Sequence, residues 1–462
     1  MKAWEFARDL LRNAEPVLRS EEEQTWDASE AIAGQDFWVR MFWQSNVPGS
    51  GAPESLAVAA VQSLENKGWV VPAENALWLE KGLAAVDEGD MEALHVAHAR
   101  LKAVLRQAKP DPEHPSQKTK RFSSFADYEA AVSFPPDVAY DVGGKDFEDR
   151  IAAGWWGQII GAAVGTALEG YTTEKLEKAF GRIDRYMRPP NTYNDDITFE
   201  LAFLYAFALK GHAVTSADIG DYWVSLIPVA WSAEAVALEN LRRGVYPPES
   251  ALDGNPFDEW IGAQMRGAIV GMVAPGRARE AARLAWLDAE VSHTGNGILG
   301  EVFNAVLVAR AFVETDMRRL TAETIDLMPA DTEYGAVVRF ALDAARKSSN
   351  WKSAWALCDA EYVEYNWIHA YPNAAAQVIA LWFGQGDFDE TLAIIGGCGH
   401  DVDCNAAQIL AAVAIAKGFS SIDKRWIDPI GDELITYMRR PAKTTTSAVC
   451  AMTVEAVRRA RS

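Results

Sequence analysis

The sequence predicts an all-α protein. Apolar residues recur at three- and four-residue spacing along most of the chain, alanine is frequent, and alternating β-branched runs are scarce. No segment has the pattern of a β-hairpin, and no repeat of fixed period indicates a solenoid. The apolar share of 49% is sufficient for a packed core. The predicted architecture is a compact helical domain preceded by a smaller helical domain.

The first 120 residues are predicted to form short helices. Asp27 and Glu30 stand three residues apart before an apolar run and resemble a capping box. The polar stretch 110–120 contains three prolines, which is typical of an exposed linker. We therefore predict an N-terminal helical domain over 1–120 and a second domain over 121–462. Apolar periodicity places the early helices at 53–66, 72–87 and 90–109.

The tryptophans of this N-terminal domain have two interpretations. They are typical of core and inter-domain packing, and they are also compatible with a stacking surface for a substrate or protein partner. No role is assigned to the domain on this basis. The six residues are Trp4, Trp26, Trp38, Trp43, Trp69 and Trp78.

The second domain is predicted to stay helical from about residue 150 onward. Its roughly 310 residues exceed the usual size of one domain, but no second linker interrupts them. The predicted helices cover 150–168, 196–210, 232–243, 278–290, 298–313, 334–346, 372–384 and 404–418.

The charge balance excludes several classes of partner. The chain has 65 acidic and 44 basic side chains, a net charge of −21, so neither nucleic acid nor an anionic membrane is an expected partner. No uncharged run reaches the roughly 18 residues of a membrane helix, and 1–16 is too charged for a signal peptide. The four cysteines are too sparse for a disulfide scaffold, which favours a reducing, cytoplasmic location. The sequence does not indicate an oligomeric state.

Two short acidic motifs precede predicted helices. Asn194, Asp195 and Asp196 stand at the start of the helix 196–210, where an ordinary acidic N-cap is the simpler interpretation. Asp401 and Asp403 follow a glycine-rich stretch and precede an alanine-rich helix. A solvated turn would explain this second pair, but clustered carboxylates also suit Mg²⁺ or Mn²⁺. The spacing does not match an EF-hand loop.

A glycine stripe lies upstream of both motifs. Four glycines recur at three- and four-residue spacing, although each costs about 1 kcal/mol relative to alanine in a helix. The stripe therefore predicts a close neighbour, either another helix backbone or a ligand. Glu169 follows directly, at a helix end where the dipole disfavours a negative charge unless a cation compensates. The four glycines are Gly154, Gly157, Gly161 and Gly165.

These pieces, in this order, resemble the ADP-ribosylglycohydrolase family. The matching motifs are the glycine-rich helix ending in Glu169, Asp195-Asp196, and the C-terminal Asp401-Val402-Asp403. Between them, GAQMRGAIVG (262–271), SHTGNGILGE (292–301) and HAYPNAAAQVIALWFGQGDFDETL (369–392) are similar to the central Met-Arg helix, the His-containing ligand loop and the segment before the last Asp pair. The resemblance covers about 150–420 and implies an orthogonal all-α fold with a binuclear Mg²⁺ or Mn²⁺ centre in a cleft.

The resemblance also implies roles for individual residues. The implied metal ligands are Asn194, Asp195, Asp196, Asp401, Asp403 and Cys404. The implied catalytic residues are Glu169, Asp196 and Asp403. The implied substrate-binding residues are Gly165, His293, Asn296, Gly297, His369 and Asn373. His293 is alternatively a satisfied core histidine, while Gly295 and Gly297 are candidate backbone donors to a diphosphate.

Two positions depart from the family pattern. Ile197 replaces the usual Thr after the Asp pair, and Cys404 replaces a Thr that commonly supplies a ligand. A thiol is a soft, poor ligand for Mg²⁺, and Asn405 is an alternative oxygen donor. The second metal, and with it full activity, therefore depends on what these residues do in the folded protein.

The resemblance and the carboxylates together predict a metal-dependent hydrolase acting on an ADP-ribosylated protein, nucleotide or small molecule. Cleavage of a ribosyl bond passes through an oxocarbenium-like state, which bound metals and a proton-transferring carboxylate can assist. Two alternatives stay open: a non-catalytic ADP-ribose-binding or structural member, favoured by Cys404, and a hydrolase of another N-glycoside.

Overall fold

A computed structural model describes residues 2–23 and 28–461 and confirms the all-α fold. Its named strands have two or three residues each and form four two-stranded antiparallel ladders. Strands this short cannot carry an alternating pattern, which explains why no hairpin is predicted. Across the described residues, no helix combines the length and the apolar character that crossing a bilayer requires.

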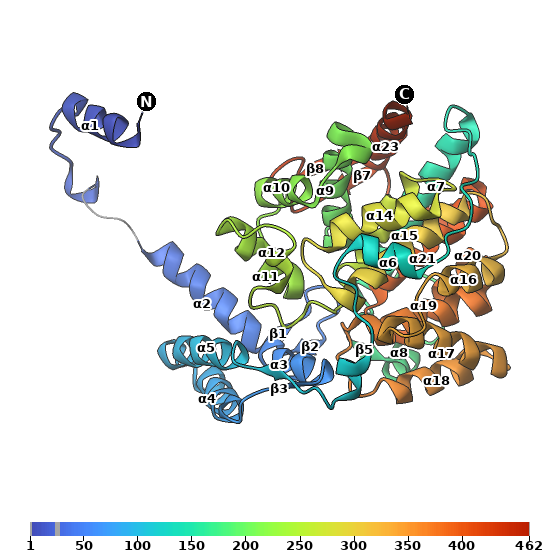
Figure 1. The fold of residues 1–462 in the computed structure, drawn as a ribbon, viewed down its shortest axis with the longest axis horizontal. Helices are drawn as coiled ribbons and strands as arrows, with labels where there is room; N and C mark the ends of the chain where they lie inside the picture. The colour runs from blue at the N-terminus through green and yellow to red at the C-terminus, as the bar shows by residue number, and fades with distance from the viewer. Residues whose placement is uncertain (1, 24–27, 462) are drawn as a thin grey trace.

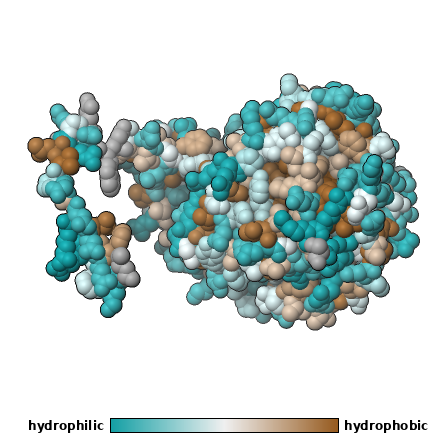
Figure 2. Space-filling view, turned by 90° about the horizontal axis from the view of Figure 1, so that it is seen from above, coloured by the Kyte–Doolittle hydropathy of each residue, from teal (hydrophilic) through white to brown (hydrophobic). Residues whose placement is uncertain are grey.

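The N-terminal part begins with an arm that stands apart from the molecule (Figure 1). No side chain of α1 is buried, and its apolar residues Trp4, Phe6, Leu10 and Leu11 are exposed. Figure 2 shows this arm as a separate lobe with apolar surface. The elements here are α1 (Ala3–Asn13), α2 (Ser29–Trp43), α3 (Leu56–Asn66), α4 (Glu74–Glu88) and α5 (Met91–Leu105), with strands β1 (Ser45–Asn46), β2 (Pro53–Glu54), β3 (Trp69–Val70) and β4 (Lys109–Pro110).

Helices α3, α4 and α5 confirm the three helices predicted before residue 110. They enclose a small core around Trp43, which is fully buried and packs on Gly82 of α4. Trp4 and Trp38 are exposed, so core packing does not account for every tryptophan here. Trp26 and Asp27 lie outside the described residues, so the predicted capping box is not described.

The segment 110–120 is anchored on both sides. Pro110 pairs with Trp69 in the β3–β4 ladder, and the Gln117 side-chain amide donates to the carbonyl of Lys67 at 2.5 Å. At the other end, the backbone N–H of Lys120 donates to the carbonyl of Asp331 at 2.9 Å. The segment therefore connects the N-terminal helices to the main body, while the domain boundary at 120 stays a prediction.

The main body contains every helix predicted after residue 150, with ends within three residues of the prediction except for the first, which begins five residues earlier. Its helices are α6 (Phe125–Ala131), α7 (Lys145–Gly165), α8 (Thr173–Phe180), α9 (Asp195–Lys210), α10 (Ser216–Leu226), α11 (Ser232–Arg242), α12 (Glu249–Leu252), α13 (Gly267–Met272), α14 (Ala278–Ala289), α15 (Gly295–Ala311), α16 (Met317–Asp326), α17 (Glu333–Lys347), α18 (Trp351–Glu361), α19 (Ala370–Gly384), α20 (Phe388–Cys398), α21 (Val402–Lys417), α22 (Lys424–Ile427) and α23 (Thr446–Arg461). Its strands are β5 (Tyr171–Thr172), β6 (Gly399–His400), β7 (Glu433–Ile435) and β8 (Lys443–Thr445). The 3₁₀ helices of the chain are η1 (Glu21–Glu23), η2 (Pro115–Lys118), η3 (Gly211–Ala213), η4 (Gln264–Arg266) and η5 (Phe419–Ser421).

Helices α7 and α21 form the centre of the core, and their backbones meet along the predicted glycine stripe. A Cβ at Gly157 would lie 2.5 Å from the carbonyl oxygen of Leu410, and one at Gly161 would lie 2.5 Å from the carbonyl carbon of Ala406. A Cβ at Gly165 would overlap the backbone of Asp403. For these three glycines the close neighbour is therefore a helix backbone, one of the two neighbours that the stripe predicts, whereas a Cβ at Gly154 would meet the side chains of Met272 and Ile415.

A matched pair of Gly→Ala variants tests this contact. Gly161→Ala should lower the free energy of unfolding by about 1–3 kcal/mol, because the added methyl group meets rigid backbone. Gly34→Ala in α2 has no neighbour within 4 Å and should raise stability by up to about 1 kcal/mol. Urea unfolding of both variants measures the two effects; equal stabilisation would contradict the proposed packing.

Candidate metal centre

Three helix ends bring the predicted carboxylates to one place. Glu169 follows the C-terminal end of α7, Asp195 and Asp196 open α9, and Asp401 and Asp403 open α21. The two helix N-termini favour the negative charges they face. Because α7 and α21 pack backbone to backbone, the end of one lies beside the start of the other.

Local hydrogen bonds fix the positions of these three helix ends. The β5–β6 ladder pairs Tyr171 with His400, and the backbone N–H of Gly170 donates to the carbonyl of His400 at 2.9 Å. Gly399 has a φ of +79°, which favours glycine at the turn into α21. Asn194 caps α9, because its Oδ1 accepts the N–H of Ile197 at 3.2 Å. The predicted N-cap is therefore present, and its amide oxygen serves the helix.

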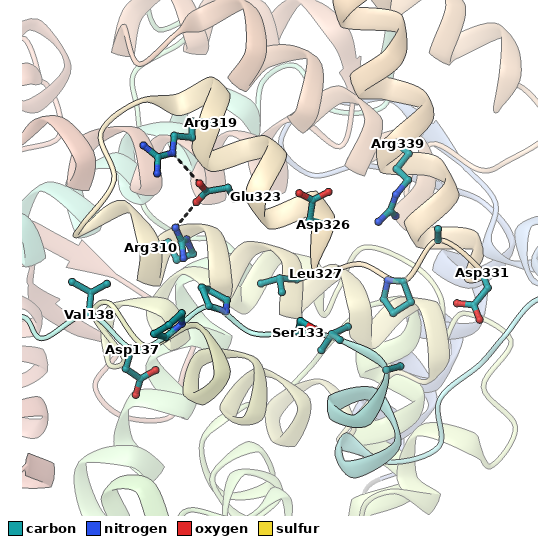
Figure 3. A pocket seen from close by; sticks show the side chains of 16 residues that line it. Ser133, Asp137, Val138, Arg310, Arg319, Glu323, Asp326, Leu327, Asp331 and Arg339 are labelled. Carbon is teal, nitrogen blue, oxygen red and sulfur yellow. Dashed lines mark hydrogen bonds and ion pairs between the residues drawn. The ribbon is translucent and has the colours of Figure 1, made fainter.

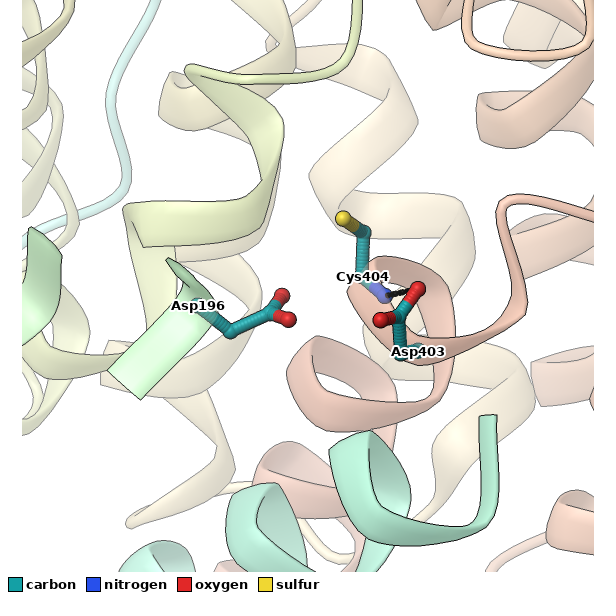
Figure 4. Close-up of side chains that lie close together, drawn as sticks. All are labelled: Asp196, Asp403 and Cys404. Carbon is teal, nitrogen blue, oxygen red and sulfur yellow. Dashed lines mark hydrogen bonds between the residues drawn. The ribbon is translucent and has the colours of Figure 1, made fainter. Parts of the chain in front are cut away.

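The carboxylates fall into two overlapping groups. The ligand atoms of Asp196, Asp403 and Cys404 lie within 4.8 Å of one another, and so do those of Glu169, Asp401 and Asp403. Asp403 belongs to both groups. Figure 4 shows the Asp196 carboxylate reaching from α9 toward Asp403 and Cys404 at the start of α21. Asp195 lies next to Asp196 but in neither group.

No protein cation balances these charges within the described residues. Neither carboxylate oxygen of Asp196 has a hydrogen-bond partner, and one oxygen of Asp401 also lacks one, although both residues are buried. No Lys or Arg of the described chain forms an ion pair with Glu169, Asp195, Asp196, Asp401 or Asp403. Buried oxygens without donors are costly unless a cation binds them. The donor set therefore fits a hard divalent cation.

The pKa shifts have the same physical origin. Burial, followed by repulsion from Asp403 and Asp401, raises the pKa of Glu169 well above its ordinary value. Burial also raises the pKa of Asp196, with Asp403 as the next cause, and raises that of Asp403 to about 6. The Cys404 thiol has a raised pKa because it is buried beside Asp196, so it keeps its proton while no metal is bound.

Amide side chains that the sequence does not single out brace the start of α21. Gln408 donates to Glu200 on α9 at 3.0 Å and to the carbonyl of Met265, and its oxygen accepts the N–H of Ala268 at 2.7 Å. It thereby joins α21, α9 and the η4–α13 segment. No local pattern in the sequence marks such long-range contacts.

Asn373 and Asn405 form a second brace. The Asn373 Oδ1 atom accepts the backbone N–H of Asp401 at 3.2 Å and the Asn405 amide at 2.7 Å. The Asn405 Oδ1 atom accepts from Gln377 at 3.1 Å. The structure thus engages both amides within the protein, and the Asn405 oxygen considered as a metal ligand is already hydrogen-bonded.

His293 belongs to neither carboxylate group, and its Nδ1 atom lies 3.9 Å from the Glu234 carboxylate. Its ring is fully buried between Ser292 Oγ, at 2.8 Å from Nδ1, and the backbone N–H of Ala263, at 3.3 Å from Nε2. Burial lowers its pKa well below the ordinary value. Both nitrogens are satisfied, which matches the core-histidine interpretation. The N–H of Gly297 donates to the carbonyl of Thr294 at 2.9 Å, so it is not available to a diphosphate.

A second polar cluster surrounds Asn296, and the sequence reasoning missed its other members. Asn296 donates to Glu259 at 3.0 Å, and the half-buried Arg121 bridges Glu259 at 2.7 Å and Glu333 at 3.0 Å. Tyr371 donates to the same Glu333 oxygen at 3.1 Å. The five members come from five distant parts of the chain, so no motif links them.

His369 and Gly165 occupy structural positions. His369 caps α19, because its Nδ1 accepts the N–H of Tyr371 at 3.2 Å, while its buried Nε2 has no partner. Burial, helped by Lys67 and Arg121, lowers its pKa to about 3. Gly165 abuts the backbone of Asp403, as described above. Substrate contacts for both residues stay predictions.

Two cavities lie outside the carboxylate site. One, of about 980 Å³, has its arginines Arg310 and Arg319 on Glu323 (Figure 3). The other, of about 880 Å³, lies between α2 and α5 on one side and α11 on the other, and includes Trp38 and Trp231. Neither cavity is lined by a predicted metal ligand.

Three comparisons relate the chain to known proteins. A family model described as ADP-ribosylglycohydrolase matches residues 144–454. An uncharacterized protein of Archaeoglobus fulgidus is 24% identical over 292 residues, which cover 60% of this chain and 90% of that protein. A solved ADP-ribosylglycohydrolase-related protein complex aligns at 19% identity and a TM-score of 0.49, covering 68% of this chain and 99% of that chain.

The carboxylate site predicts an unusual dependence of stability on pH. The raised pKa values mean that the folded protein binds more protons than the unfolded chain between about pH 4 and the folded pKa, so the metal-free protein should lose stability as pH rises from about 5 to 8. Mn²⁺ should restore it, and more so at higher pH, because protons and metal compete for the same oxygens.

Thermal unfolding with chelator and with Mn²⁺ measures this effect. Asp403→Asn should weaken both the pH dependence and the metal response, whereas Glu174→Gln on the surface of α8 should change neither. A metal-free protein that becomes more stable toward pH 8 would disprove the charge interpretation.

Proposed function

The chain belongs to the ADP-ribosylglycohydrolase family, and on that premise we propose that it is a metal-dependent hydrolase that cleaves the bond between ADP-ribose and an acceptor. The observation that carries this proposal is the pair of carboxylate groups sharing Asp403. The ADP-ribosylated substrate is its expected partner. The four cysteines are free, which supports the proposed cytoplasmic location.

Two divalent cations, Mg²⁺ or Mn²⁺, are the proposed cofactors. Asp196, Asp403 and Cys404 would hold one, and Glu169, Asp401 and Asp403 the other, with Asp195 and Asn194 beside them. When bound, such cations supply Lewis acidity and orient oxygen groups of a substrate. The unpaired oxygens of Asp196 and Asp401 support this arrangement.

Glu169 is the proposed proton-transferring residue. Its carboxylate lies within 4.8 Å of the Asp401 and Asp403 oxygens, so that beside the bound cations it could protonate a leaving group and later accept a proton from water. Asp196 and Asp403 would hold the cations that orient the ribose oxygens, which assists the passage through an oxocarbenium-like state. Both acidic residues stay fixed because they belong to the first turns of rigid helices.

Release of ADP-ribose from a panel of ADP-ribosylated proteins, nucleotides and small molecules tests the proposal. With Mg²⁺ or Mn²⁺ the protein should turn over, and Glu169→Gln or Asp403→Asn should lower the rate by about 10²–10⁴-fold. Glu174→Gln should leave it unchanged. Turnover in chelator, or full activity of Asp403→Asn, would refute the metal mechanism.

Cys404 provides a test of metal preference. Its Sγ lies 3.8 Å from Met265 Sδ and within reach of the Asp196 and Asp403 oxygens. Replacing this soft ligand by a hydroxyl in Cys404→Thr should tighten Mg²⁺ binding by about tenfold, the usual scale of changes around a metal site. Calorimetry measures the affinity, with Cys450→Thr as control.

Cys404→Thr also distinguishes the proposed hydrolase from the alternative, a non-catalytic ADP-ribose-binding protein. A wild-type protein that binds ADP-ribose but releases none, and in which Cys404→Thr restores turnover, would be a non-catalytic binding member. Unchanged Mg²⁺ affinity in Cys404→Thr would place the thiol outside the ligand shell.

A further inference from the structure

A turn from the N-terminal part of the chain lies against Glu169. Strands β1 and β2 form a small hairpin (Figure 1). Its turn, Val47–Ala52, reaches the end of α7, more than 100 residues further along the sequence. The family match begins at residue 144, so this hairpin lies outside it.

Gly49 is the residue of the turn that lies against the end of α7 and Glu169. A Cβ at this position would lie 2.7 Å from Glu169 Oε1 and would overlap the carbonyl of Thr166. Gly49 does not have a positive φ, so its backbone conformation does not require glycine. At Gly51, two residues later, the reason for glycine is conformational: its φ is +77°, and a Cβ there would have no neighbour within 4 Å. The missing side chain at Gly49 is therefore explained first by the fixed carbonyl of Thr166 and second by the Glu169 carboxylate beside it.

Residues of the main body hold the turn in place. Arg188 donates to the carbonyl of Gly49 at 2.6 Å and reaches Thr166 Oγ1 at 3.4 Å, so one guanidinium joins the turn to the end of α7. The Tyr171 hydroxyl, two residues after Glu169, donates to the carbonyl of Ser50 at 3.1 Å.

Hydrogen bonds fix the conformation of the hairpin itself. Within the turn, the N–H of Val47 donates to the carbonyl of Ala52 at 2.8 Å, and both residues are buried. At its base, Trp231 of the main body donates to Glu54 at 3.0 Å. The turn therefore has a defined position at both ends.

The Glu169 carboxylate, in contrast, has no hydrogen-bond donor among residues 2–23 and 28–461. The Asp401 and Asp403 carboxylates lie on one side of it, and they repel it while no cation is bound. The Gly49 backbone occupies space on another side. Steric contact with the turn thus limits where an otherwise unrestrained carboxylate can move.

We propose that the Val47–Ala52 turn is a part of the active site that positions Glu169 against the Asp401–Asp403 carboxylates. The turn acts through Glu169 and has no chemical role of its own. This inference rests on the proposed function for its kinetic consequence, whereas its effect on the metal site is independent of the reaction.

Gly49→Ala tests the inference, with Gly34→Ala as the matched control on an open helix face. The added methyl group should displace Glu169 and lower kcat for ADP-ribose release by about 10–100-fold with little change in KM, since small displacements of a catalytic group have effects of that size. Mn²⁺ affinity measured by calorimetry should fall by about tenfold. Gly34→Ala should match the wild type in all three quantities.

Thermal unfolding in chelator shows whether Gly49→Ala is folded. If it is not, Tyr171→Phe decides instead, because it removes only the hydroxyl that holds Ser50 and should lower kcat and Mn²⁺ affinity in the same direction. A folded Gly49→Ala with wild-type kcat and wild-type Mn²⁺ affinity would overturn the inference. If the wild type binds Mn²⁺ but releases no ADP-ribose, the proposed function fails, and the Mn²⁺ affinity of Gly49→Ala alone decides the role of the turn.

Discussion

The contact on which the rest of the structure depends is the backbone approach of α7 to α21. Side chains normally hold two helices 8–10 Å apart, and the glycines of α7 remove the side chains that would keep the two backbones at that distance. Each glycine lowers helix propensity by about 1 kcal/mol, so the helix is stable because it is buried against its neighbour. The approach aligns the end of α7 with the start of α21, which places Glu169 beside Asp403.

The buried carboxylates of this protein are balanced in two different ways. Arg266, fully buried, pairs with Asp288 at 2.5 Å, Glu234 at 2.8 Å and Glu301 at 3.5 Å, so a guanidinium supplies the positive charge here, although Asp288 Oδ1 and both Glu301 oxygens have no hydrogen-bond partner. The Asp196–Asp403 group has no such cation within the described chain. The two clusters are built from the same residue types, so burial alone does not distinguish a structural ion pair from a metal site. The two clusters differ because the Asp196–Asp403 group lacks a positively charged side chain. A bound cation would have to supply that charge, so cation binding is coupled to the folding of the centre.

The sequence predicts those features that depend on local pattern. Helix periodicity, the glycine stripe and the acidic helix starts are short-range, and the structure has each of them. The braces from Gln408 and Asn373, the Arg121 bridge and the Gly49 contact join residues that are far apart in the chain, and no spacing rule marks them. For the same reason His293, prominent in sequence, proves to be satisfied by its neighbours, and its loop carries no free Gly297 donor.

The N-terminal helices are joined to the body at more places than the hairpin. The buried Lys67 ammonium pairs with Asp258 at 2.5 Å, and Asp258 accepts the Thr294 hydroxyl at 2.6 Å, directly before α15. Ser63 accepts the Trp260 indole N–H at 3.1 Å on the same side. Breaking a buried pair such as Lys67–Asp258 leaves an uncompensated charge, which costs about 3–5 kcal/mol. The N-terminal part is thus tied energetically both to the loop before α15 and, through Gly49, to Glu169, so its removal would disturb the body at both places.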